Sequence, residues 1–247
     1  MRTRTLFAAL AFAPSLALAQ LAPQERTIAQ AVDRRNAESL ALLERIVNIN
    51  SGTRNLAGVR AVGAALKAEF DALGFATRWV DGAAFSRAGH LIAEHSGPGP
   101  KILMIGHLDT VFEPSSPFQR FERLDDSTAT GPGIIDMKGG DVIIVAALKA
   151  LKDAGALAGM NITVVFDGDE EDAGLPHSVA RKALVDAAQG ASVALGFEDG
   201  AADPKTAVIA RRSATTWKLT TTGMAGHASQ IFRDDLGAGA LNEAARI

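Results

Sequence analysis

Four groups of polar residues stand at the ends of apolar runs in this sequence, and their residue types could support metal chemistry. His107 and Asp109 follow the run KILMIG, and Asp136 lies within GPGIIDMKGG. The acidic run Asp169–Asp172 follows ITVVF, and Glu198–Asp199 close VALGFE. In open α/β sheets, ligands bind outside the carboxyl ends of the strands. These groups could therefore converge on one site although they are far apart in the sequence.

Each group alone has a simpler interpretation. A histidine two residues before an aspartate is more often a hydrogen-bonded strand end than a metal ligand, and acidic runs are usually solvated turns. Several carboxylates in one crevice, however, would repel one another and shift towards protonation. A divalent cation removes this conflict, and imidazole with carboxylates suits zinc or a neighbouring transition metal. Because the chain has no cysteine, such a set is typical of a catalytic site rather than a closed structural one.

The adjacent acids Glu170 and Glu171 allow a division of labour at such a site. One could bind metal while the other takes a proton from a water whose pKa the metal lowers to about 7. This combination predicts hydrolysis. The stretch GPGIIDMKGG fits neither the phosphate loop nor the dinucleotide fingerprint, which disfavours a nucleotide-binding enzyme. A formal charge of -3 without a basic patch argues against a nucleic-acid partner.

The elements that would position these residues alternate between helices and strands. At 247 residues and 47% hydrophobic content, the chain can bury a sizeable core. Apolar periodicity predicts helices over residues 27–48, 56–73, 138–154 and 176–188, and strands over 75–80, 90–95, 101–107, 161–167 and 191–198. This order predicts a three-layer α/β domain with a mostly parallel sheet covered on both faces.

The last part of the chain has a different pattern. Residues 206–213 and 214–223 alternate with period 2, which predicts half-exposed antiparallel strands. Residues 235–247 carry one helical apolar stripe and reach the last residue without a capping signal. We therefore expect a fragment, or a second domain whose remainder is missing.

The motifs GHLDT, GPGIIDMKGG, DEE and GFE, in this order and spacing, resemble a family of zinc exopeptidases and amidohydrolases. That family includes glutamate carboxypeptidase, acetylornithine deacetylase, succinyl-diaminopimelate desuccinylase and aminoacylase. The resemblance runs from about residue 47 to the end of the chain. It implies a catalytic zinc-hydrolase domain over residues 20–207, incomplete at its C-terminal part, and the beginning of an α+β lid or dimerisation domain over residues 208–247.

The resemblance also implies a site with two zinc ions. His107 and Glu198 would bind the first metal, Asp136 would bridge both, and Glu171 would bind the second. Asp109 would orient the imidazole of His107, as carboxylates near metal-binding histidines commonly do. At Glu198–Asp199 the aspartate competes for the ligand role, but the glutamate ends the strand where the family has its acid.

Two residues would take part in the reaction without binding metal. The resemblance makes Glu170 the general base, and it makes His227 of GMAGHAS the lid residue that supports the oxyanion in a partner's active site, which implies a homodimer. The histidines His90, His95 and His177 are expected to be structural or exposed. Arg211 and Arg212 are expected to form a solvated strand end, with binding of a substrate carboxylate as the alternative role.

The function implied is hydrolysis of an amide bond next to a free carboxylate, in the manner of a carboxypeptidase. Deacylation of N-acyl amino acids uses the same chemistry and is the close alternative. A periplasmic binding protein that keeps the fold without catalysis is the alternative from another class. Substrates would be small peptides or N-acyl amino acids.

The first residues predict export. Met1–Arg4 carries two positive charges and precedes an apolar run over residues 5–19, which is shorter than the roughly 20 residues a membrane-spanning helix needs. We place signal cleavage between Ala19 and Gln20, which predicts a periplasmic or secreted protein without a membrane anchor. Zero cysteines mean that no disulfide stabilises it.

The family's last histidine ligand for the second metal has no counterpart in this sequence. We therefore predict that the chain, expressed alone, binds one zinc ion better than two and has weak or no activity. Metal analysis of the purified chain and an assay on N-acyl amino acids measure both. Two tightly bound zinc ions together with near-normal turnover would contradict this expectation.

Overall fold

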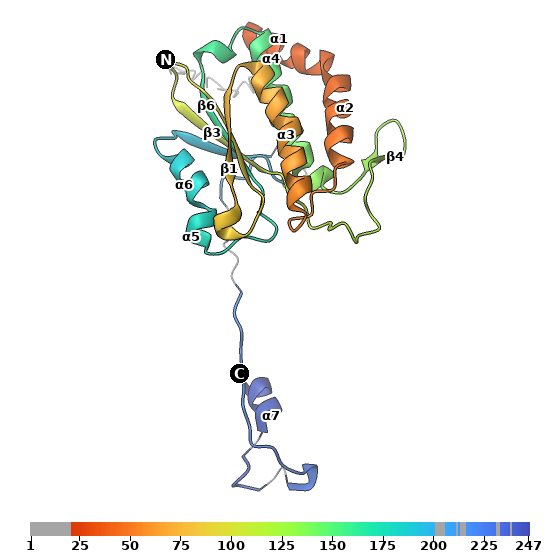
Figure 1. The fold of residues 1–247 in the computed structure, drawn as a ribbon, viewed down its shortest axis with the longest axis vertical. Helices are drawn as coiled ribbons and strands as arrows, with labels where there is room; N and C mark the ends of the chain where they lie inside the picture. Colours follow the sequence, from red (N-terminus) through yellow and green to blue (C-terminus); the bar gives the residue numbers. More distant parts are fainter. Residues whose placement is uncertain (1–20, 201–205, 211, 213–215, 231–232, 238) are drawn as a thin grey trace, which may run out of the picture. The chain divides into compact units, whose positions relative to one another are not determined.

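The computed structural model describes residues 21–200, 206–210, 212, 216–230, 233–237 and 239–247 (Figure 1). The chain divides into two compact units, residues 1–204 and 205–247. The expected signal peptide over residues 1–19 and the residue Arg211 lie outside the described residues. Within the described part, no helix is long and apolar enough to span a membrane.

A five-stranded sheet lies at the centre of the first unit, in the order β1-β2-β6-β3-β7. Its strands are β1 (Ala76–Asp81), β2 (Gly89–His95), β3 (Lys101–His107), β6 (Asn161–Asp167) and β7 (Val193–Gly196). The register pairs β3 parallel with both β6 and β7, whereas β2 is antiparallel to β1 and β6. All strands except β2 therefore run in one direction. The carboxyl ends of these four strands therefore lie at the same end of the sheet.

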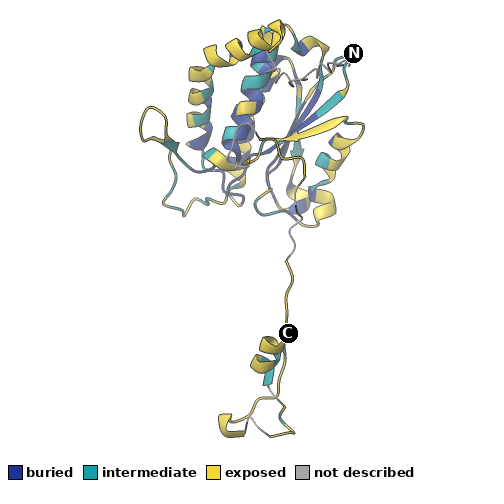
Figure 2. Cartoon of the chain, turned by 180° about the vertical axis from the view of Figure 1, so that it is seen from behind, coloured by how far each residue is buried: buried dark blue, intermediate teal, exposed yellow. Residues whose placement is uncertain are grey.

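Helices cover both faces of this sheet. The helices on one face are α1 (Pro23–Arg34), α2 (Asn36–Val47), α3 (Leu56–Leu73) and α4 (Gly139–Asp153), and those on the other are α5 (His177–Ala180) and α6 (Lys182–Ala188) (Figure 1). Buried residues lie along the strands and on the sides of the helices that face them (Figure 2). The three-layer α/β architecture predicted from the sequence is confirmed.

Shorter elements complete the first unit. The strands β4 (Glu122–Arg123) and β5 (Ala129–Thr130) form a small antiparallel hairpin. Short helical turns span Ala83–Phe85, Ile134–Lys138 and Leu157–Gly159. The helix α3 has the bounds that its apolar periodicity predicts. It ends at Gly74, whose φ of 90° is the left-handed conformation that glycine adopts without strain.

The strand β7 forms one edge of the sheet. Among the described residues it pairs only with β3. Its apolar residues Val193 and Leu195 are 44% and 40% exposed. As far as the structure describes the first unit, this edge of the sheet is open along its backbone, and its apolar side chains are partly exposed.

Two predicted helices are each divided in the structure. The helix predicted over residues 27–48 is interrupted at Arg35, within the four polar residues 33–36, which provide no apolar side chain to hold a further turn against the core. Arg35 Nε instead donates to Asp153 at 2.6 Å. The helix predicted over residues 176–188 is interrupted at Arg181, whose guanidinium binds Asp169. In both cases the break lies at an arginine that pairs with an acid outside its own helix.

The strands predicted over residues 206–213 and 214–223 are wrong for the residues that the structure describes there, none of which is buried or in a strand. A half-exposed strand is stable only with a partner strand, so alternation alone does not form one. The second unit contains a short 3-10 turn, Ala228–Gln230, and the helix α7, Gly239–Arg246. That helix begins four residues later than predicted, after the glycine Gly237 with its φ of 64°.

The main core cluster lies between the sheet and the larger helical layer. Phe70 of α3 is fully buried there, and its ring centroid lies 5.4 Å from that of Phe75 and 5.7 Å from that of Phe166. Edge-to-face and tilted arrangements of this kind add to the hydrophobic stabilisation of aromatic side chains.

Replacing Phe70 with Ala should lower the free energy of unfolding by about 3–5 kcal/mol, because it leaves a cavity among three rings. Leu56→Ala at the exposed start of the same helix is the control, with an expected loss of about 0.5 kcal/mol or less. Urea unfolding followed by circular dichroism measures both. Equal losses would show that this aromatic cluster does not hold the helix to the sheet.

Candidate metal centre

His107 is the last residue of β3 and lies at the edge where the parallel strands end. Its Nδ1 is 3.0 Å from the backbone carbonyl oxygen of Asp109 and 3.5 Å from that residue's Oδ1. A proton on Nδ1 is donated to this carbonyl, which leaves Nε2 free to face the opposite side. Nε2 lies 2.9 Å from Oδ1 of Asp136 and 3.4 Å from Oε1 of Glu198.

These three residues present one ligand atom each within 4.8 Å of one another. The imidazole is buried, whereas the side chains of Asp136 and Glu198 are 58% and 38% exposed. Asp136 comes from the short helical turn Ile134–Lys138, and Glu198 lies two residues beyond β7. The site therefore has a buried nitrogen at its base and partly exposed carboxylates at its open side. Solvent can reach a metal ion bound between them from that side.

The carboxylate of Asp109 makes a second set of contacts that the sequence alone does not reveal. Its Oδ1 accepts the backbone N–H of Glu170 at 3.0 Å, and its Oδ2 accepts that of Glu171 at 3.1 Å. Thr53 Oγ1 donates to Oδ2 at 2.7 Å. Burial raises the pKa of Asp109, but the contacts with His107, Thr53 and the backbone N–H of Glu170 outweigh it and lower this pKa below its usual range. The loop that carries both glutamates is thus fastened to the end of β3.

The pKa values of the surrounding groups reflect strong mutual interactions. Burial lowers the pKa of His107, but the contacts with Asp109 and the nearby negative charges of Glu198 and Asp141 outweigh it and raise this pKa to about 10. Burial and the repulsion of Asp136 raise the pKa of Glu171 to about 7. Excess negative charge around one imidazole is the electrostatic setting that a divalent cation neutralises.

The donor set fits zinc. One imidazole nitrogen and carboxylate oxygens are among the ligands that zinc takes in catalytic sites, where the protein leaves a position for water or substrate. His107, Asp136 and Glu198 supply such ligands within reach of one ion. Glu171 lines the same cavity as Asp136, so it could serve a second ion nearby.

Two buried charged residues near this site are not among the site residues predicted from the sequence, although one of them, Lys138, lies within GPGIIDMKGG. Asp141 of α4 is fully buried, and neither of its carboxylate oxygens has a hydrogen-bond partner among the described residues. Burial raises its pKa well above the usual range. A side chain at Gly106 would meet Asp141 Oδ1 at 2.4 Å, so glycine is required at that position of β3.

Lys138 provides the neighbouring positive charge. Its Nζ donates to the backbone oxygens of Ile46 at 3.0 Å and Ile49 at 2.9 Å, at the C-terminal end of α2. Burial lowers the pKa of Lys138 to about 8. The segment that contains Asp136 is thereby attached to the last turn of a helix, where carbonyl groups attract positive charge.

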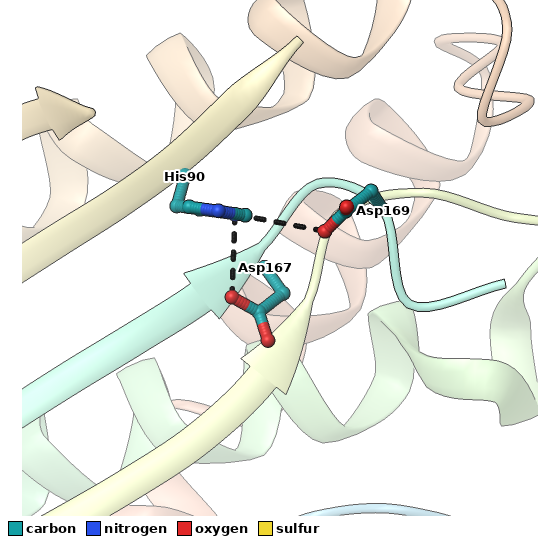
Figure 3. Close-up of side chains that lie close together, drawn as sticks. All are labelled: His90, Asp167 and Asp169. Atoms are coloured by element: carbon teal, nitrogen blue, oxygen red, sulfur yellow. Dashed lines mark ion pairs between the residues drawn. The ribbon is translucent and has the colours of Figure 1, made fainter. Parts of the chain in front are cut away.

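A second buried cluster consists of His90, Asp167 and Asp169 (Figure 3). His90 Nδ1 accepts the backbone N–H of Gly168 at 3.2 Å and lies 3.2 Å from Asp167 Oδ1. His90 Nε2 lies 2.9 Å from the carbonyl oxygen of Ala180, to which it donates. Both ring nitrogens of this histidine are therefore used within the protein.

The carboxylate of Asp169 is likewise already paired. Arg181 Nη1 lies 2.5 Å from its Oδ1, and the backbone N–H of Gly174 donates to its Oδ2 at 2.7 Å. A guanidinium in that position disfavours an additional cation by repulsion. The cluster fastens the loop after β6 to His90 of β2 and, through His90, to Ala180 of α5. His90, expected to be structural or exposed, is structural.

The site residues predicted from the sequence do not all lie close together in the structure. His107, Asp136 and Glu198 meet directly, and Glu170 and Glu171 join them through Asp109. Asp199 is exposed and does not reach the cluster of ligand atoms. His227 lies in the second unit, where its Nδ1 is 2.9 Å from Ser229 Oγ. Its role at an active site stays a prediction.

Zinc affinity should rise with pH, because His107 must lose a proton to offer Nε2 and its pKa in the metal-free chain is raised to about 10. One displaced proton gives an increase of about tenfold per pH unit between pH 7 and pH 8.5. Competition with a chromophoric chelator measures it. His107→Gln should abolish both binding and pH dependence, whereas His177→Gln on α5 should change neither. A pH-independent affinity would contradict the assignment.

Comparison with known proteins identifies the family of this chain. Residues 103–239 match the model of peptidase family M20/M25/M40. The chain is 32% identical to carboxypeptidase G2 of Pseudomonas sp. (strain RS-16), across 99% of this chain and 58% of that protein. Among solved structures, human carnosine dipeptidase 1 has a TM-score of 0.58 at 20% identity, over 80% of this chain and 43% of that one.

The dipeptidase Dug1p of Saccharomyces cerevisiae also has a TM-score of 0.58, at 16% identity, over 69% of this chain and 40% of that one. At these identities the two structures support the fold alone. The chain spans less than two thirds of the length of each of these relatives. The match over residues 103–239 includes His107 and all the carboxylates described above. This chain belongs to peptidase family M20/M25/M40.

Proposed function

We propose that this chain forms part of an exported, zinc-dependent metallopeptidase that hydrolyses an amide bond next to a free carboxylate. The observation that carries the proposal is the grouping of His107 Nε2 with the carboxylates of Asp136 and Glu198 within 4.8 Å. The general base Glu170 lies on a loop that Asp109 fastens to the same strand end. The relative of this chain, carboxypeptidase G2, carries the name of a carboxypeptidase.

Each residue of the site has a separate task in this proposal. His107, Asp136 and Glu198 would hold one zinc ion, and Glu171 would, together with Asp136, hold a second. Bound zinc would lower the pKa of water and polarise the scissile carbonyl. Glu170 takes the proton from the attacking water and delivers it to the leaving nitrogen. The carboxylate of Asp109 accepts the backbone N–H of Glu170 and so keeps Glu170 at a fixed distance from the metal ligands.

The substrate would be a small peptide or an N-acyl amino acid. A carboxypeptidase and a deacylase hydrolyse the same type of amide bond and need the same metal ligands and general base, so both activities fit the site. Export rests on the predicted signal peptide over residues 1–19. Homodimerisation through residues 208–247 would bring His227 to a partner's site, where an imidazole could stabilise the developing negative charge on the carbonyl oxygen.

Replacing Glu170 with Gln should lower turnover of an N-acyl amino acid at least about 100-fold, because a neutral amide cannot accept the proton. Single-turnover assays with the zinc-loaded chain in excess detect even weak hydrolysis. Zinc content should not change, since Glu170 is not a ligand in this proposal. Glu94→Gln, an exposed change on β2, is the matched control.

The metal content of the Glu170→Gln chain separates two roles. Retained zinc with lost turnover supports a general base. Lost zinc would make Glu170 a ligand, and unchanged turnover with unchanged zinc would remove it from the mechanism.

A further inference from the structure

A cavity of about 400 Å³ opens beside the metal centre, and Asp136 and Glu171 form part of its wall. The rest of the wall is mainly apolar and includes Val111, Phe112 and Ile135. Its volume falls within the range of small-molecule sites, roughly 300–1,000 Å³. A substrate whose scissile carbonyl lies at the carboxylates would therefore place a neighbouring group in this cavity.

The walls of the cavity are fixed by contacts outside it. The rings of Phe112 and Phe118 meet edge to face, with centroids 5.1 Å apart. Asn50 Nδ2 donates to the carbonyl oxygen of Phe112 at 2.9 Å and to Gln119 Oε1 at 2.7 Å. The loop between β3 and β4 is thus held in shape without a ligand, which lowers the ordering cost of binding.

The solvent-facing side chains of this cavity are unusually apolar. Val111 is 62% exposed and Ile135 is 66% exposed, although neither position is needed for the core. Two large aliphatic groups exposed beside one cavity favour an apolar occupant, since burying them would remove their surface from water.

Charge decides which part of the substrate this is. The charged residues among those that line the cavity are Asp136 and Glu171, and none is a lysine or an arginine. Away from the metal ligands, this wall therefore offers no permanent positive charge to pair with the free carboxylate of the substrate, which lies on the leaving-amine side of the bond. The acyl side carries no such charge.

We propose that this cavity binds the acyl side of the substrate and selects a bulky apolar acyl group over a small one. The proposal rests on the proposed function, because it takes the carboxylate-bearing side of the bond from there. Val111 and Ile135 are specificity-determining residues in this assignment, and Phe112 with Phe118 forms the rigid part of the wall. The substrate class is an amino acid, or a short peptide, with a large aliphatic or aromatic group on the acyl side.

The test is a ladder of N-acyl glycines titrated into the zinc-loaded chain and followed by ligand-observed NMR, which also detects hydrolysis. Lengthening the acyl chain from butanoyl to hexanoyl adds two methylene groups. Each buried methylene should tighten binding about fourfold, so the dissociation constant should fall about fifteenfold. Ile135→Asn should reduce this ratio to less than about threefold without adding charge beside the metal ligands.

Ile143→Asn is the matched control, because Ile143 is a similarly exposed isoleucine, at 57%, on α4 and outside the cavity. It should keep the full ratio. Val111→Asn is a second cavity variant, for use if Ile135→Asn fails to fold, and it should also flatten the ladder. Equal affinities for butanoyl and hexanoyl glycine in the unchanged chain, or an unchanged ratio in a folded cavity variant, would overturn the proposal.

Zinc content measured on the same samples separates this proposal from the proposed function. A chain that holds zinc and shows a flat ladder lacks the acyl selectivity but keeps the metal centre. A chain that takes no zinc and hydrolyses nothing contradicts the proposed function. In that case a steep rise in affinity with acyl length in the metal-free chain still supports the apolar cavity, because Phe112 and Phe118 in its wall are held by contacts that do not involve the metal ligands. Equal affinities would overturn it.

Discussion

The carboxylate of Asp109 is the interaction on which the rest of the site depends. It is completely buried, and it is stabilised by the hydroxyl of Thr53 and by the backbone N–H groups of Glu170 and Glu171. Hydrogen bonds to a charged group contribute about 1.5–3 kcal/mol each, and a buried charge without them is strongly unfavourable. The loop after β6 can therefore adopt few positions relative to the end of β3.

The loop after β6 is also held by an ion pair and by hydrogen bonds to a histidine. Arg181 pairs with Asp169, and His90 accepts the N–H of Gly168 while donating to Ala180. Two neighbouring acids of one motif are therefore in unlike settings, since Asp169 is a fully buried internal anchor, whereas Glu170 is exposed and is bound to Asp109 through its backbone N–H. Loops that carry reactive groups are commonly positioned by rigid elements in this way.

Much of the architecture follows from apolar periodicity. The bounds of α3, β3 and β6 agree with those predicted, because their buried faces and their glycine or polar ends are local features. The breaks at Arg35 and Arg181 could not be predicted, because each arginine binds an acid of another element, Asp153 at the end of α4 and Asp169 in the loop after β6. The strands predicted after residue 205 failed in the described residues because pairing is not a local property.

The site shows the same division between local and distant information. The residue types at 107, 136 and 198 predict a metal centre from their motifs. The burial of Asp141 and Lys138 could not be predicted, because it follows from the contact of Asp141 with Gly106 of β3 and from the hydrogen bond of Lys138 to Ile46 of α2. The apolar cavity also depends on the folded loops around Val111 and Ile135, which periodicity does not describe.

The open edge of β7 has a mechanical consequence. Glu198 follows this strand by two residues, and the strand is held on one side, by β3, among the described residues. A further strand added to the free side would cover Val193 and Leu195 and restrict the twist of β7. Because Glu198 moves with the end of that strand, the stiffness of the sheet's outer edge would set how firmly one carboxylate is held against His107.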